Sequence, residues 1–237
     1  MTAVFKRDLA NYFVTPLGYV YIAAFTLGTS IYFILTNVTN SFSDLGGVFS
    51  FILLVLMITT PLLTMSLLSE EYKQKTDQLL LTAPVRVIDI IMGKFAAAFS
   101  VYLIALALTL LCPLTVAIAG NLAIVSVIGN YTALICAGAA FISIGLFMSS
   151  LTQTQLVAAL SSLGAMLIIY FADWATSAAA SGFAKFISDV VGSLSLFRRY
   201  ELFARGIFSV ADLFFYLSVC AFFLFLAARC LEKKRWS

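Results

Sequence analysis

Two adjacent acidic residues, Glu70 and Glu71, are the first candidates for acid–base or metal chemistry in this sequence. Adjacent residues of a helix point about 100° apart, so these carboxylates do not converge as a catalytic pair would. The sequence has no histidine, and its four cysteines form no CxxC pair and show no metal-ligand spacing. We therefore expect no catalytic residue and no metal site, and we interpret Glu70 and Glu71 as interface residues.

Gly93-Lys94 is the second candidate, because it matches the end of a phosphate-binding loop. The full motif needs a glycine five residues before Gly93 and a serine or threonine after Lys94. This sequence has Ile88 and Phe95 at those positions. We therefore expect no nucleotide and no other cofactor in this chain.

Composition indicates what must position these residues. Hydrophobic residues make up 62% of the 237 residues and charged residues 11%, whereas a soluble domain has about 25% charged residues. The apolar runs between charged clusters are long enough to cross a bilayer, where a helix satisfies its own backbone hydrogen bonds. The sequence thus predicts an all-α integral membrane protein with six transmembrane helices. The expected spans are about 17–36, 48–68, 95–119, 130–151, 155–173 and 208–229.

Basic residues predict the orientation, because they concentrate in cytoplasmic segments. Six spans place both termini on one side. That side holds ten Lys and Arg residues, namely Lys6, Arg7, Lys73, Lys75, Arg86, Lys94, Arg229, Lys233, Lys234 and Arg235. The other side holds Lys185, Arg198, Arg199 and Arg205, all in one loop. Both termini are therefore expected in the cytoplasm.

Two segments outside the spans have amphipathic patterns. Residues 1–16 place apolar side chains on one side of a helical wheel and Lys6 and Arg7 on the other, with Asp8 interrupting the apolar side. This pattern is typical of a short helix on the cytoplasmic membrane surface, and a plain flanking segment is the alternative. Residues 183–197 predict an outer-side amphipathic helix before the last span, resting in the outer leaflet or packed under a loop.

The segment 69–94 connects the second and third spans. Its first part suits a helix, Leu79-Leu80-Leu81 forms an apolar tip, and Pro84 breaks the run. A helix–break–helix of this kind can insert in a groove of a soluble partner and transmit force. The alternative is a solvated loop that only sets topology.

This segment also resembles a known family. Pro61-Leu62-Leu63-Thr64-Met65 leads into Glu70-Glu71, then into Thr76-Asp77-Gln78-Leu79-Leu80-Leu81-Thr82-Ala83-Pro84-Val85 and Gly93-Lys94. These motifs are similar to those of ABC-2 type transporter permeases, and the nearest resemblance is to the gliding-motility-associated group. The resemblance covers nearly the whole chain. Two further motifs support it, namely Gly145-Leu146-Phe147-Met148-Ser149-Ser150-Leu151-Thr152 and Phe203-Ala204-Arg205-Gly206.

The resemblance implies a single transmembrane domain over 1–237, six helices with both termini cytoplasmic, and a coupling helix between helices 2 and 3. It implies a permease dimer, of two copies or of homologous chains, with nucleotide-binding ATPase subunits that hold ATP and Mg. It also implies the cytoplasmic (inner) membrane of a prokaryote. The expected ATPase-coupling residues are Glu70, Glu71, Thr76, Leu79, Leu80, Leu81, Pro84, Asp89 and Lys94.

The predicted spans hold almost no ionisable residues, which argues against an ion-coupled carrier or a channel and suits a hydrophobic or amphipathic substrate. Small residues in span 4, Gly138, Ser143 and Gly145, allow close helix approach, either at a dimer or gating contact or in ordinary packing. Thr59, Thr60, Pro61 and Thr64 are expected to bend span 2 and to contribute to a pathway.

The leading hypothesis is thus a permease subunit, an exporter rather than an importer, with an ATPase, a second permease and membrane lipid as partners and no nucleic acid. The alternative is a non-transporting membrane scaffold that docks a cytoplasmic partner. A lipid-modifying membrane enzyme is a third reading, disfavoured because no acid–base or metal constellation is present.

Overall fold

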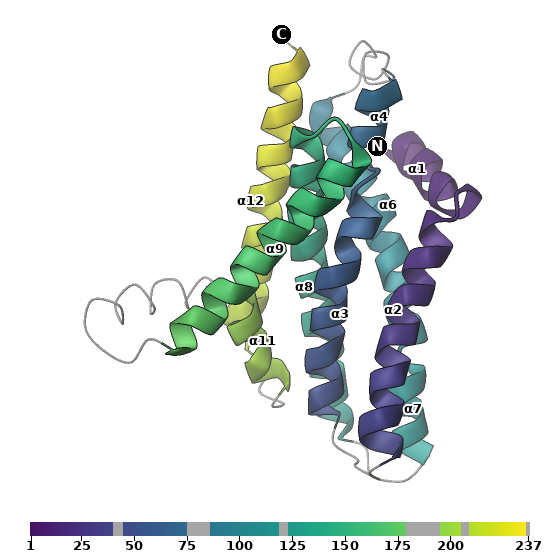
Figure 1. The fold of residues 1–237 in the computed structure, drawn as a ribbon, viewed down its shortest axis with the longest axis vertical. Coiled ribbons are helices and arrows are strands. Elements are labelled where there is room, and N and C mark those ends of the chain that lie inside the picture. Colours follow the sequence, from purple (N-terminus) through teal and green to yellow (C-terminus); the bar gives the residue numbers. More distant parts are fainter. Residues whose placement is uncertain (40–44, 75–85, 119–122, 179–194, 205–208, 236–237) are drawn as a thin grey trace.

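The computed structural model describes residues 1–39, 45–74, 86–118, 123–178, 195–204 and 209–235, and all regular secondary structure within them is helical (Figure 1). Six helical stretches are long and apolar enough to cross a membrane. They are Leu17–Val38, Gly46–Tyr72, Val87–Ile118, Ile124–Leu151, Gln155–Trp174 and Val210–Lys233. The expected all-helical fold with six candidate spans is confirmed.

Several spans are built from more than one helix. The first joins α2 (Leu17–Phe33) to a π-helical turn (Ile34–Val38), and the second joins α3 (Gly46–Thr64) to α4 (Ser69–Gln74). The third joins α6 (Val87–Leu108) to α7 (Leu111–Ile118). The other spans are α8 (Ile124–Leu151), α9 (Gln155–Ala178) and α12 (Val210–Arg235), and two shorter helices are α1 (Thr2–Val14) and α11 (Leu196–Ala204).

Two helices begin earlier than the predicted spans. The helix of the third span begins at Val87, whereas the span was expected from about 95, and that of the fourth begins at Ile124, whereas the span was expected from about 130. In the third span, Asp89 and Lys94 lower the local hydropathy, although both lie inside α6. The third span is also interrupted at Thr109 and restarts as α7, whose Pro113 lies in the first turn, where a missing N–H costs no helical hydrogen bond.

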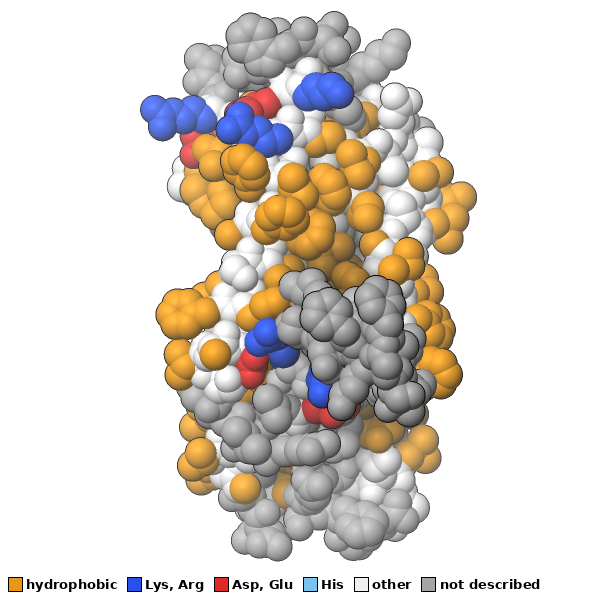
Figure 2. All heavy atoms as spheres, turned by 90° about the vertical axis from the view of Figure 1, so that its left-hand side faces the viewer, with side chains coloured by type: hydrophobic (Ala, Val, Ile, Leu, Met, Phe, Trp, Pro, Cys, Tyr) orange, Lys and Arg blue, Asp and Glu red, His pale blue; other side chains and the backbone are white. Residues whose placement is uncertain are grey.

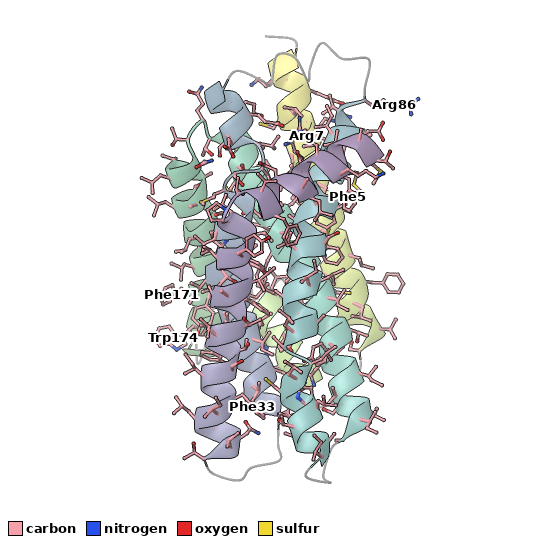
Figure 3. The ribbon with its side chains drawn as sticks, turned by 90° about the vertical axis from the view of Figure 1, so that its right-hand side faces the viewer. Phe5, Arg7, Phe33, Arg86, Phe171 and Trp174 are labelled. Carbon is pink, nitrogen blue, oxygen red and sulfur yellow. The ribbon has the colours of Figure 1, made fainter. Side chains whose placement is uncertain are left out.

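The centre of the bundle is α8, which packs against α3, α6, α9, α11 and α12. Most of α8 is buried, whereas only a small share of α9 and of α12 is fully buried. Phe171 and Trp174 of α9 point away from the bundle (Figure 3). Figure 2 shows hydrophobic side chains over one face, between charged side chains near its top and others lower down. This distribution is typical of a bundle surrounded by lipid.

Two glycines of α8 bring its neighbours close. A Cβ on Gly138 would overlap the ring of Tyr102 from α6, and a Cβ on Gly145 would overlap Thr64 from α3. Ser143 is fully buried and donates a hydrogen bond to the carbonyl of Ala140. These small residues therefore serve intramolecular packing, and their use at a dimer or gating contact stays a prediction.

Both termini lie at one end of the bundle (Figure 1), which we call the terminal end. There α1 packs against α6 and α2. Figure 3 shows it lying across the spans, with Arg7 on its side toward the terminal end and Phe5 on its side toward the middle of the bundle. The predicted N-terminal amphipathic helix is confirmed as a helix.

Toward the opposite end, α11 is tied to the spans that surround it. Arg199 contacts Asp212 of α12 at 2.5 Å, and its guanidinium lies 4.1 Å from the ring centroid of Phe215. Tyr216 donates a hydrogen bond to the carbonyl of Leu196. The helix predicted over 183–197 lies outside the described residues except for its last members. The helix described before α12 begins at Leu196.

Candidate functional site

The predicted coupling residues divide into two groups. Glu70 and Glu71 lie in α4, and Asp89 and Lys94 lie in α6. The rest of the predicted site, including the apolar tip, lies outside the described residues. Its members are Thr76, Leu79, Leu80, Leu81 and Pro84. The structure therefore shows where the connecting segment leaves α4 and rejoins the bundle next to α6.

Lys94 is the most informative of these residues. Its side chain is only 2% exposed, although it is charged. Its ammonium group lies 2.8 Å from Glu71 Oε1, 3.3 Å from Asp8 Oδ2 and 2.6 Å from the carbonyl oxygen of Leu67. An ammonium has three donors, so each donor has an oxygen within reach.

Arg7 completes a group that we call the charged junction, namely Arg7, Asp8, Glu71 and Lys94. The Arg7 guanidinium lies 2.8 Å from Asp8 Oδ1 and 2.5 Å from Glu71 Oε1. Partial burial disfavours the charged guanidinium, but Asp8 and then Glu71 outweigh it and raise the pKa of Arg7. Two cations thus face two carboxylates, and the formal charges of the junction cancel.

Gly93 allows α1 to lie close enough to α6 for this contact. A Cβ on Gly93 would stand 3.1 Å from the side chain of Val4 and 3.2 Å from the carbonyl oxygen of Met1. Those distances are tight, so a larger residue at 93 would push α1 outward. The pair Gly93-Lys94 therefore acts in packing and charge pairing between α1 and α6.

The charged junction lies beside an interruption of the second span. Residues 65–68, which we call the span-2 break, form turns between α3 and α4. Backbone groups near such a break need partners from elsewhere. Tyr12 of α1 donates to the carbonyl of Leu63 at 2.6 Å, and Lys94 of α6 donates to that of Leu67. Burial raises the pKa of the Tyr12 phenol, which keeps it protonated as a donor.

Ser149 of α8 is a hydrogen-bond partner for backbone N–H groups at the break. Its hydroxyl oxygen accepts hydrogen bonds from the backbone N–H groups of Leu68 and Ser69, at 3.2 and 3.3 Å. These groups lie at the start of α4, so Ser149 acts as an N-terminal cap supplied from a distant helix. Side chains of α1, α6 and α8 therefore hold the span-2 break.

A cleft of about 490 Å³ opens next to this site, between α1 and the start of α4. Its lining combines charged groups with polar side chains, including Asn11, Thr15 and Ser66. Among the residues that the structure describes, no three His, Cys, Asp or Glu side chains come together as a metal site. The arrangement connects α1, α4 and α6 through charged side chains.

Sequence reasoning missed the role of Asp8 and placed Lys94 before the third span. Asp8 was interpreted as an interruption of an apolar face, but that face packs on α6, where Lys94 is its partner. A carboxylate on the packing side of one segment and a lysine next to a glycine in another were the available signals. Nothing in the sequence indicated that these positions, 86 residues apart, would meet.

The hydroxyl groups of span 2 lie inside α3 and bond to its own backbone. Thr59 donates to Val55 at 2.8 Å, and Thr64 donates to Thr60 at 3.1 Å. Thr60 is likewise buried and donates to Leu56, and Pro61 stays within the helix. Such bonds are typical of bent membrane helices, and a role for these residues in a pathway stays a prediction.

Comparison with known families identifies the chain. The family described as ABC-2 family transporter protein matches residues 41–234. Comparison with curated proteins found no match. Members of the matched family are usually non-catalytic membrane subunits, and the family in general implies an ATPase partner. The chain therefore belongs to the ABC-2 family of transporter proteins, as a multi-pass permease component of the membrane.

Proposed function

We propose that the chain is the permease subunit of an ATP-driven exporter, with its terminal end in the cytoplasm. The observation that carries the proposal is the charged junction. It fixes α4, from which the chain continues into 75–85, against α1 and α6. If a partner moved that segment, the motion would be transmitted to α4 and, through the charged junction, to α1 and α6.

The partner is a separate ATPase subunit that holds ATP and Mg, because this sequence has no complete phosphate-binding loop. The segment 75–85, with its Leu79–Leu81 tip, acts as the coupling helix. The ten basic residues of the terminal end favour a cytoplasmic position. The whole of 1–237 then forms one transmembrane domain in a prokaryotic inner membrane, and the motifs favour the gliding-motility-associated group.

A transporter of this kind works as a permease dimer, either of two copies or with a homologous chain. The exposed apolar faces of the outer spans are available to lipid and to such a partner. The substrate is hydrophobic or amphipathic. The described charged side chains lie near the ends of the spans or in the charged junction, which leaves the middle of the bundle uncharged.

Isolation of the tagged chain from its native membrane in mild detergent, followed by mass spectrometry, tests the proposal. A soluble protein with a complete phosphate-binding loop should follow the chain. Changing Leu79, Leu80 and Leu81 to Asp should release it while the permease stays inserted. The matched control, Phe42→Asp in the 40–44 segment, should keep it bound.

The alternative, a scaffold that docks a cytoplasmic partner without transport, predicts a different outcome. In that case no ATPase would be recovered even after cross-linking, although another soluble protein would follow the chain. A cysteine at position 2 that reacts only with reagents added on the outside would contradict the cytoplasmic position of the terminal end.

A further inference from the structure

We infer that Lys94 is a positioning residue that locks the span-2 break, so that α1, α4 and the start of α6 move as one unit. This inference rests on the proposed function, because it assigns how motion of the coupling segment is transmitted. In the proposed function the Leu79–Leu81 tip contacts the ATPase. Lys94, itself among the expected coupling residues, acts behind this tip, through α4, with a side chain that is only 2% exposed.

The Lys94 ammonium holds three elements at once. It lies among an oxygen of the break (Leu67), an oxygen of α4 (Glu71) and an oxygen of α1 (Asp8). Burying a cation is costly unless its donors are paired with good geometry. The three elements must therefore keep their relative positions for the ammonium to stay satisfied, and a shift of any one affects the other two.

The span-2 break also depends on side chains from other helices. Without support, a turn of this kind between two helices is a hinge. Here side chains from three other helices satisfy the backbone around it, and Tyr12 and Ser149 provide neutral hydrogen bonds. Ser149 and Lys94 both bond to the break and to α4, but Lys94 alone among the three side chains carries a charge. Its removal should therefore affect the hinge more than loss of either hydroxyl group.

The contact between α1 and the spans joins the same elements a second time. Gly93, next to Lys94, lets the backbone of α1 approach α6, and Asp8 faces Lys94 from α1. Arg7, from the same helix, reaches Glu71 of α4. The amphipathic N-terminal helix is thereby linked through side chains to the exit of span 2.

Hydrogen–deuterium exchange on the permease, purified with its ATPase in nanodiscs, tests the lock without knowledge of the substrate. Lys94→Met should increase exchange of peptides covering residues 1–16 and 65–74 by about tenfold or more, because local opening free energies control exchange. Peptides from the middle of α8 and α12 should keep the exchange of the unmodified protein. Asp8→Asn should give a smaller increase in the same two regions.

Two further variants distinguish a specific lock from general loosening. The double variant Asp8→Asn/Lys94→Met should exchange no faster than Lys94→Met, because both changes remove one network. Lys94→Arg keeps the charge and should exchange more slowly than Lys94→Met in both regions. Arg229→Gln, which removes an exposed pair in α12, is the matched control and should leave both regions unchanged.

The readout of coupling is ATP hydrolysis by the same complexes, compared with hydrolysis by the ATPase alone. Lys94→Met should still retain the ATPase, but hydrolysis should fall toward the rate of the ATPase alone, and Lys94→Arg should restore part of the difference. Unchanged exchange in Lys94→Met, uniform loosening of all six spans, or local loosening with unaltered hydrolysis would each overturn the inference. If the unmodified chain recovers no ATPase, the proposed function fails, while the exchange data still test the lock.

Discussion

Each end of the bundle uses ion pairs to tie a short helix to the spans, but the pairs differ in range. At the terminal end, Lys94 contacts Asp8, 86 residues away, and Arg7 contacts Glu71, 64 residues away. Toward the opposite end, Arg199 contacts Asp212, 13 residues away. The first joins α1 to α4 and α6, which are distant from it in sequence, whereas the second clamps two consecutive helices.

The two pairs also differ in burial. The Lys94 side chain is 2% exposed, whereas that of Arg199 is 27% exposed and rests on the ring of Phe215. A cation that reaches solvent and an aromatic face keeps some stabilisation when its carboxylate is lost. The buried Lys94 ammonium has neither bulk solvent nor an aromatic face to replace a lost carboxylate. The terminal end is therefore where a single change should have long-range effects, in keeping with a site where motion enters.

The largest effect is expected for Lys94→Met, measured by reversible unfolding in detergent and SDS. It removes the buried cation and leaves two carboxylates and the Leu67 carbonyl without it. Loss of one partner of a buried pair typically costs about 3–5 kcal/mol of unfolding free energy. If Lys94→Met lost as little unfolding free energy as Asp212→Asn, the two ends of the bundle would not differ in the way described.

Asp212→Asn is expected to have an intermediate effect, about 1–3 kcal/mol, because an asparagine oxygen still accepts a hydrogen bond and Arg199 keeps its contact with Phe215. The loosening should stay local, with faster exchange in 195–204 and none in 1–16. Faster exchange at α1 in this variant would show that the two ends are coupled after all.

Tyr12→Phe and Tyr216→Phe test single neutral hydrogen bonds at the two ends. Each removes one phenol donor to a backbone carbonyl, that of Leu63 or of Leu196. Both should cost about 1–2 kcal/mol, since a buried acceptor loses its partner. Equal losses would show that the contrast between the ends lies in their charges, and a much larger loss for Tyr12 would assign the contrast to the break itself.

Arg229→Gln should have the smallest effect. Arg229 and Glu232 form an exposed pair in α12, with side chains 64% and 42% exposed. Exposed pairs contribute about 0–1 kcal/mol. This variant gives the baseline for the series, and a loss comparable to that of Lys94→Met would show that the assay reports on helix content rather than on the junction.

Sequence reasoning predicted the parts of this protein that depend on local pattern. The six apolar runs and the helix at 1–16 follow from composition and periodicity, whereas Glu70 and Glu71, expected after the second span, lie in α4 within its helical stretch. The helix of the third span begins at Val87, ahead of the expected start of the span near 95, because the sequence reasoning placed Asp89 and Lys94 before that span. A charged residue lowers the apparent hydropathy of a helix, and the sequence does not show whether that charge has a buried partner.

The sequence by itself determined that this chain is a helical membrane protein, because the apolar runs leave no other way to satisfy the backbone in lipid. The family also follows from the sequence, since the family match covers residues 41–234. Tertiary structure alone decided that Asp8, Glu71 and Lys94 meet, and that Tyr12, Lys94 and Ser149 hold the span-2 break. The physical reason is that ion pairs and caps of this kind depend on how distant helices pack, and packing is set by shape across the whole bundle rather than by the spacing of residues along one segment.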